Sequence, residues 1–256
     1  MNNKVIDVEG IIINVKNYGD TSKIIDILTK EYGVIGVIAK GCKSIKSNLR
    51  SVTDKLTYAT FTIYFKKDKL SILSEASVIN NFSNIKKDIE KISYASFLID
   101  LSNQVYKQCE DNNLYDLLIS SLIKINDNFN PLIITNILEL KYLEYLGVMP
   151  NLNGCSICGS KSVVTLSSDK GGYLCSKCHT NEPIVSDKAI KLVRMYTLVD
   201  INIIEKLDIK KDVVYEVNNF IDDYYDRYTG LYLKSKTFLK NITSVKWPSF
   251  YIIFVF

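Results

Sequence analysis

Histidine is almost missing from this chain of 256 residues, which contains only His179. Histidine-dependent nucleophilic catalysis needs an imidazole beside a serine or cysteine, and a zinc-hydroxide site usually needs several imidazoles. The one histidine directly follows Cys178, so no such dyad or ligand set is expected elsewhere. We therefore expect a protein that is not an enzyme, and a zinc hydrolase is a weak alternative.

Long apolar runs are missing as well. A membrane-spanning helix needs about 20 consecutive apolar residues, and the nearest approach, residues 250–256, is far too short. We expect this tail either to pack in a groove or to remain a sticky terminus. The N-terminus shows no signal peptide, so we expect a cytoplasmic protein with reduced cysteines and no membrane partner.

Positive charge is unevenly distributed along the chain. Residues 1–80 hold eleven lysines and one arginine against eight acidic residues, and this excess equals the whole net charge of +4. Residues 81–256 are balanced. A basic segment joined to a neutral one favours a polyanionic partner. Four of the cations occupy eleven residues that contain no acid: Lys40, Lys43, Lys46 and Arg50.

Residues 40–50 are interpreted as a loop that contacts the nucleic-acid backbone. Four cations could neutralise three or four phosphates, giving a salt-sensitive affinity that does not depend on base sequence. Ser44, Ser47 and Asn48 could donate further hydrogen bonds to phosphate oxygens. An ordinary solvated loop is the alternative. A nucleotide-binding P-loop is rejected, because Cys42 separates the second glycine from the lysine.

The first 80 residues show the pattern of short strands, with a hairpin signal at Gly33. Phe61, Ile63 and Phe65 alternate, so they should share one face. The expected strands are residues 5–13, 23–29, 34–39, 58–65 and 70–76. Five strands with one longer loop predict an OB-fold. Base-stacking candidates near its surface are Tyr18, Tyr32, Tyr58 and Tyr64.

Beyond residue 83 the apolar spacing becomes helical. The expected helices are residues 85–108, 114–125, 132–146, 187–198, 211–228 and 231–239. The predicted fold class is α+β. An N-terminal five-stranded OB-fold β-barrel that binds DNA (1–80) is followed by an all-α helical domain (81–256). A four-cysteine zinc knuckle is inserted at residues 151–183.

The cysteines carry the most specific pattern in the chain. Cys155 and Cys158 form one CxxC pair, Cys175 and Cys178 form another, and sixteen residues separate the pairs. This spacing is typical of a zinc site, and four thiolates leave no position open for water. We therefore predict structural zinc. Two disulfides in a secreted protein are the alternative, and His179 is a possible competing ligand.

Several segments resemble one family in the same order along the chain. Tyr18-Gly-Asp-Thr-Ser-Lys-Ile-Ile-Asp-Ile-Leu-Thr29 and Gly33-Val-Ile-Gly-Val-Ile-Ala-Lys-Gly41 resemble the N-terminus of the recombination mediator RecO family. Leu140-Lys-Tyr-Leu-Glu-Tyr-Leu-Gly-Val-Met-Pro150 and the cysteine pairs are similar to its centre. Leu233-Lys-Ser-Lys-Thr-Phe-Leu239 is similar to its final helix.

This resemblance implies a bacterial, nucleoid-associated factor in DNA repair and homologous recombination. Such proteins bind single- and double-stranded DNA, anneal complementary strands and work with RecR. Together they load RecA onto DNA coated by the single-stranded-DNA-binding protein, whose C-terminal tail docks on the helical domain. The resemblance places DNA contact at Lys40, Lys43, Lys46 and Arg50, and zinc at the four cysteines. The alternatives are a zinc-ribbon nucleic-acid-binding module in transcription or translation, and a structural adaptor.

Overall fold

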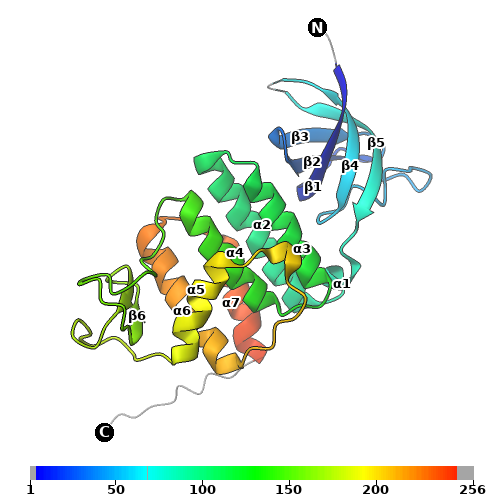
Figure 1. Cartoon of the computed structure of the whole chain (residues 1–256). Coiled ribbons are helices and arrows are strands. Elements are labelled where there is room, and N and C mark those ends of the chain that lie inside the picture. Colours follow the sequence, from blue (N-terminus) through cyan, green and yellow to red (C-terminus); the bar gives the residue numbers. More distant parts are fainter. Residues whose placement is uncertain (1–3, 68, 247–256) are drawn as a thin grey trace. The chain divides into compact units, whose positions relative to one another are not determined.

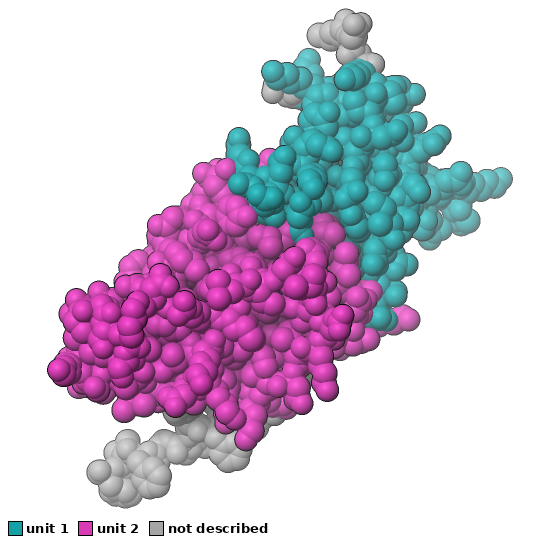
Figure 2. All heavy atoms as spheres, viewed as in Figure 1, with its two compact units in different colours: residues 1–86, 110–116 teal, residues 87–109, 117–256 magenta. Residues whose placement is uncertain are grey.

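The computed structural model describes residues 4–67 and 69–246, so the expectation for the tail at 250–256 lies outside the described residues. The chain divides into two compact units (Figure 2). Residues 1–86 and 110–116 form one, called the barrel unit here. Residues 87–109 and 117–256 form the other, called the helical unit.

The barrel unit contains the five strands that the sequence predicts (Figure 1). They close in the order β1-β2-β3-β5-β4, with β3 and β5 parallel and the other neighbours antiparallel. This OB-like barrel confirms the predicted fold of the N-terminal part. The strands are β1 Lys4–Tyr18, β2 Ser22–Thr29, β3 Gly33–Ala39, β4 Tyr58–Phe65 and β5 Ser71–Asn80.

Strand β1 closes the barrel and is longer than the sequence suggests. Its first part pairs with β4, from Lys4 opposite Phe65 onward, and its second part pairs with β2. An irregularity between Ile12 and Asn14 allows the strand to bend. At the crossover, a Cβ on Gly10 would come 2.5 Å from the Ile27 side chain. Only glycine permits the strands to approach so closely there.

The barrel core follows the alternation of the strands. Phe61 and Ile63 are fully buried, and Phe65 packs at the edge of the same cluster, which confirms their shared face. Cys42 is also fully buried in this core. The first residues of the loop after β3 are therefore anchored against the barrel.

The helical unit is a bundle in which α2 packs against α4 and α7, and α4 also packs against α5 and α6 (Figure 1). The helices of the described residues are α1 Ser83–Lys86, α2 Ile89–Cys109, α3 Asn113–Asn126, α4 Pro131–Tyr145, α5 Asp187–Leu198, α6 Lys211–Tyr228 and α7 Lys234–Lys246, with a short 3-10 turn at Ile201–Ile203. The last helix thus begins three residues later than expected.

The helix expected at residues 85–108 is interrupted at Asp88. The Asp88 carboxylate accepts hydrogen bonds from the backbone N–H groups of Glu90 and Lys91, at 2.8 and 3.3 Å. Aspartate caps a helix N-terminus well because it satisfies donors that have no partner within the helix. The segment therefore forms two helices, α1 and α2.

Helix α4 lies in the centre of the bundle and is buried over most of its length. Asn130 caps its first turn, accepting from the N–H groups of Leu132 and Ile133. At the other end Gly147 adopts a φ of 70°, and the N–H of Val148 donates to Leu143. These bonds form a Schellman ending, so the glycine stops the helix where the sequence predicts.

Between α4 and α5 the chain forms a small two-stranded hairpin, which projects from one side of the bundle (Figure 1). Its strands are β6 Thr165–Ser167 and β7 Gly172–Leu174. Gly172 has a φ of 147°, and a Cβ there would lie 2.3 Å from the Asn151 carbonyl oxygen.

Among the helices of residues 4–67 and 69–246, none is long and apolar enough to span a membrane.

Candidate functional site

The four cysteines of residues 151–183, called the cysteine knuckle here, lie together in space. Their sulfur atoms are all within 4.8 Å of one another, and those of Cys158 and Cys175 are 3.6 Å apart. Cys155 and Cys175 are buried, whereas Cys158 is exposed. All four thiols are free, and a disulfide would require about 2.05 Å between sulfurs. The two-disulfide alternative does not describe this arrangement.

Two tight turns direct the thiols to one point. The N–H of Gly159 donates to the Cys155 carbonyl at 2.8 Å, and the N–H of His179 donates to the Cys175 carbonyl at 2.9 Å. Gly159 adopts a φ of 75°, which favours glycine. Each CxxC pair thus wraps around the same point, and the set can hold a metal ion.

The backbone also makes a thiolate easier to form at one of these positions. Burial raises the pKa of Cys155. Hydrogen bonds from the backbone N–H groups of Cys158, Cys175 and Ile157 outweigh this effect and lower the pKa to about 6. Metal ligation requires the thiolate. The local fold therefore favours the thiolate at Cys155, whereas a hydrogen bond with Cys158 and burial raise the pKa of Cys178 to about 12.

His179 has a different role from the cysteines. Its Nε2 lies 2.6 Å from the carbonyl oxygen of Glu182, which can only accept, so this nitrogen donates. The metal-binding group of the described residues consists of the four cysteines without His179. The structure gives the histidine a contact within its own loop.

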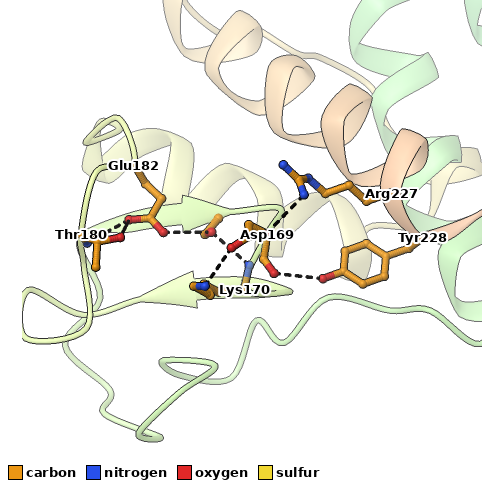
Figure 3. A network of polar contacts seen from close by, with 7 residues as sticks. Asp169, Lys170, Thr180, Glu182, Arg227 and Tyr228 are labelled. Carbon is orange, nitrogen blue, oxygen red and sulfur yellow. Dashed lines mark hydrogen bonds and ion pairs between the residues drawn. The ribbon is translucent and has the colours of Figure 1, made fainter.

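Glu182 fastens the loop that follows the second cysteine pair. Its carboxylate accepts from the N–H and hydroxyl of Thr180 at 3.0 and 3.1 Å, and from the hydroxyl of Ser167 at 3.3 Å (Figure 3). The N–H groups of Thr180 and of Glu182 itself lower the pKa of Glu182 to about 2. The carboxylate is therefore ionised throughout the neutral range.

The tip of the β6–β7 hairpin is tied to helix α6. Arg227 donates to the Asp169 carboxylate at 3.3 Å, and the Tyr228 hydroxyl donates to the Asp169 carbonyl at 3.4 Å (Figure 3). Both side chains come from the last turn of α6. Besides its two connecting segments, the knuckle is therefore attached to the bundle through the contacts of Asp169 with α6.

The candidate DNA-contact residues lie on the long loop between β3 and β4. Lys40, Lys46 and Arg50 are exposed, and no ion pair joins them to an acid among the described residues. Lys43 is half-buried, and its ammonium donates to the Gly19 carbonyl at 3.2 Å. Successive turns order the loop, with Ser47 N–H donating to Ser44 and Arg50 N–H to Ser47. Three of the four cations are therefore fully available to a ligand.

The tyrosines proposed for stacking divide into two groups. Tyr18, Tyr32 and Tyr64 are 54%, 47% and 41% exposed. The expectation for Tyr58 is wrong, since it is buried at 9% exposure and its hydroxyl donates to the Glu9 carboxylate at 2.5 Å. Its ring packs near Phe82, 6.4 Å between centroids. The Tyr58 side chain is packed inside the barrel unit, so its ring has no exposed face on which a base could stack.

Sequence reasoning missed a buried charged cluster in the helical unit. Lys236 lies 2.7 Å from an Asp222 oxygen and 3.9 Å from Glu139, and Lys240 lies 3.3 Å from Asp222. Glu139 is only 2% exposed, and burial raises its pKa to about 8. The one available signal was a glutamate inside the apolar run of residues 132–143.

A second missed feature is an apolar surface beside α5. Met195 and Leu198 are 42% and 75% exposed. Lys191 and Arg194 line the same shallow groove, and Lys188 lines a neighbouring one. Apolar side chains ringed by cations match the chemistry of an acidic peptide with hydrophobic residues.

Both parts of the chain match known families. The family described as Recombination protein O N terminal matches residues 1–82, and that described as Recombination protein O C terminal matches residues 86–237. The DNA repair protein RecO of Listeria monocytogenes serotype 4b is 34% identical over 246 residues, covering 94% of this chain and 95% of the relative. RecO of Bacillus pumilus is 33% identical over 247 residues, covering 94% and 96%.

These matches place the chain in a class of proteins of DNA repair and recombination. Within this class, the chain belongs to the RecO family, which confirms the resemblance seen in its motifs.

Proposed function

We propose that this protein is a recombination mediator that binds single- and double-stranded DNA and anneals complementary strands. It works with RecR to load RecA onto DNA coated by the single-stranded-DNA-binding protein, in the cytoplasm and at the nucleoid. It performs no covalent chemistry. One observation carries the proposal: Lys40, Lys46 and Arg50 are exposed and unpaired among the described residues, on the part of the chain that holds the whole net charge.

The proposed mechanism is electrostatic. Cations of residues 40–50 contact phosphates and displace counterions, which lowers the repulsion between two strands. Phosphate contacts carry no sequence information, and bases held in this way stay free to find their complements. Lys43 contributes less than its neighbours because its ammonium is already bound to the Gly19 carbonyl.

Zinc is the metal we propose for the cysteine knuckle. Zn–S bonds of about 2.3 Å in a tetrahedron place neighbouring sulfurs about 3.8 Å apart. The described sulfurs, all within 4.8 Å and as close as 3.6 Å, fit this requirement. Cys155, Cys158, Cys175 and Cys178 would hold the ion, which would supply rigidity. Because four thiolates can also suit iron, elemental analysis should distinguish the two metals.

For the tail of the single-stranded-DNA-binding protein, the proposed docking surface is the groove beside α5. Lys191 and Arg194 would pair with the acidic residues of the tail, beside the exposed Met195 and Leu198. Leu198→Asp should abolish binding of a peptide with the tail sequence, and DNA binding should be unchanged. Unchanged peptide affinity would move the docking site elsewhere.

A strand-annealing assay tests the central proposal. The triple variant Lys40→Ala, Lys46→Ala, Arg50→Ala should anneal slowly, and its salt slope for DNA binding should fall by about two to three units. The matched control replaces three exposed lysines of the helical unit, Lys87, Lys107 and Lys206, by alanine. It loses the same charge and should anneal normally.

Two outcomes would reject the assignment. Equal loss in both triple variants would mean that only the net charge matters, and an unchanged slope in the first would remove residues 40–50 from the interface. If a knuckle variant such as Cys178→Ser instead lost DNA binding while the bundle remained folded, the zinc-ribbon alternative would be favoured.

A further inference from the structure

A second basic and aromatic surface lies on the barrel unit, next to the turn between β4 and β5. An open groove of about 520 Å³ runs there, lined by residues of two strands, β3 and β4, and of the turns β2–β3 and β4–β5. It is called the β4–β5 groove here. The residues that matter below are Tyr32, Gly36, Phe65, Lys67, Lys69 and Leu70.

The floor of the β4–β5 groove is apolar and includes an open aromatic face. The rings of Tyr32 and Phe65 are 5.4 Å apart at 41°, and Tyr32 remains 47% exposed. Gly36 has no side chain, and a Cβ there would meet the Leu70 side chain at 2.8 Å. The Leu70 side chain therefore lies directly over the backbone of β3 and adds to the apolar floor.

The rim of the groove is basic. Lys67 and Lys69 are exposed, and Lys66 is half-buried beside them. No ion pair engages these three ammonium groups among residues 4–67 and 69–246. Two acidic residues are close in sequence: Glu31 precedes Tyr32, and Asp68 lies between Lys67 and Lys69. Cations therefore prevail around an apolar floor.

This combination matches an unpaired nucleic-acid strand better than an acidic peptide. Proteins that bind single strands stack bases on aromatic side chains and track the backbone with cations. Lysines alone would serve either ligand. The exposed Tyr32 ring, supported from one side by Phe65, adds the flat surface that a base requires.

The groove is distinct from residues 40–50, although both belong to the barrel unit. Val34 and Gly36, near the start of β3, line the groove, whereas the loop begins after Ala39, at the end of β3. At about 3.3 Å per residue, Val34 and Gly36 lie roughly 20 and 13 Å from Lys40 along the extended chain. One barrel thus presents two separate basic surfaces.

We propose that the β4–β5 groove is a second nucleic-acid site, which binds an unpaired strand by stacking a base on Tyr32 and pairing phosphates with Lys67 and Lys69. The inference rests on the proposed function and deepens it. Residues 40–50 hold one strand, and the groove holds a second strand with its bases exposed for pairing.

The first test uses the aromatic ring. Tyr32→Ala should weaken binding of a short single-stranded oligonucleotide about 5- to 150-fold, the range for losing one stacked base. Tyr32→Phe keeps the ring and should bind like the wild type. Affinity for a blunt duplex should be the same in all three proteins, because paired bases cannot stack on the groove. Equal single-strand affinities for Tyr32→Ala and the wild type would overturn the proposal.

The second test removes the two exposed charges of the rim. Lys67→Ala with Lys69→Ala should lower the single-strand salt slope by about 1.4 units and slow annealing. The control, Lys87→Ala with Lys206→Ala, should leave both unchanged. If the groove variant kept its slope but lost binding of a glutamate-rich peptide, the groove would be a protein-binding site and the proposal would be wrong.

These outcomes separate the two levels of inference. If the variant of residues 40–50 loses annealing while both groove variants behave as the wild type, the groove assignment fails and the proposed function stands. If the wild-type protein binds no oligonucleotide at low salt, both fail together.

Discussion

In the barrel unit, Lys40, Lys46 and Arg50 extend into solvent without an acidic partner among the described residues, whereas in the helical unit Lys236 is held 2.7 Å from Asp222 and covered by the bundle. Exposed cations keep their hydration until a polyanion displaces it. Buried ones must be paired to be tolerated at all. The pairing state of a lysine therefore tells whether its charge serves a ligand or the fold.

The largest effect is expected in the cysteine knuckle, where a substitution should affect the helical unit and leave the barrel unit unchanged. Cys155→Ser should remove the metal and unfold residues 151–183, an effect of several kcal/mol because metal binding and folding are coupled. Metal content and hydrogen exchange across the knuckle measure it. Cys109→Ser, outside the cluster, should retain the metal. The Cys155→Ser variant should still bind DNA through residues 40–50. A wild-type protein that is stable without metal would contradict the prediction.

The buried Glu139 gives the next largest effect, seen as a dependence on pH. Burial raises the pKa of Glu139 to about 8, with Lys236 and Lys240 opposing the shift and Asp222 and Asp226 adding to it. The folded protein thus binds a proton more tightly than the unfolded chain. The stability that this group contributes should decline by roughly 4–5 kcal/mol between pH 4.5 and 8 and change little above.

Denaturant unfolding at pH 5, 7 and 9 checks this expectation. Glu139→Gln should remove the decline, because an amide does not titrate. Glu144→Gln, at an exposed position of the same helix, should keep it. Parallel pH profiles for the wild type and Glu139→Gln would show that Glu139 is ionised in the folded protein.

A smaller effect sharpens the comparison within residues 40–50. Lys46→Ala should reduce the salt slope of DNA binding by about 0.7–0.9 units. Lys43→Ala should reduce it less, since the Lys43 ammonium already donates to the Gly19 carbonyl. Binding titrations over a range of salt concentrations, from roughly 50 to 300 mM, resolve the difference. Equal reductions would mean that Lys43 releases this bond when DNA binds.

The smallest effect is expected at a pair that is charged but exposed. Arg227→Ala removes the contact with Asp169, and both side chains are 53% exposed. Exposed pairs contribute about 0–1 kcal/mol, so the unfolding free energy should change by less than that. A larger loss would show that the knuckle depends on α6 more than this contact indicates.

Local chemistry explains which features could be predicted from the sequence. The spacing of Cys155 and Cys158 from the second pair determines a metal site because each turn is short. Alternation identified the faces of β4, and Gly147 marked the end of α4. Asp88 interrupts a helix whose apolar spacing continues across it, since its side chain competes for the backbone donors.

The remaining features depend on contacts between distant positions. Tyr58 becomes buried because Glu9 and Phe82 meet it from elsewhere in the barrel unit. Glu139 is tolerated because burial favours its neutral form and because Lys236, far along the chain, lies 3.9 Å from it. Neither contact leaves a periodic signal, so neither could be read from spacing.

The double pairing of β1 has a consequence for the order in which the molecule forms. Its ladder with β4 joins Lys4 to Phe65, and β5 joins β4 to β3, so the barrel cannot close until both β4 and β5 have left the ribosome. The turns around the cysteines join partners only a few residues apart. Since non-local pairing slows folding, ring closure should be the slow kinetic phase of the barrel unit.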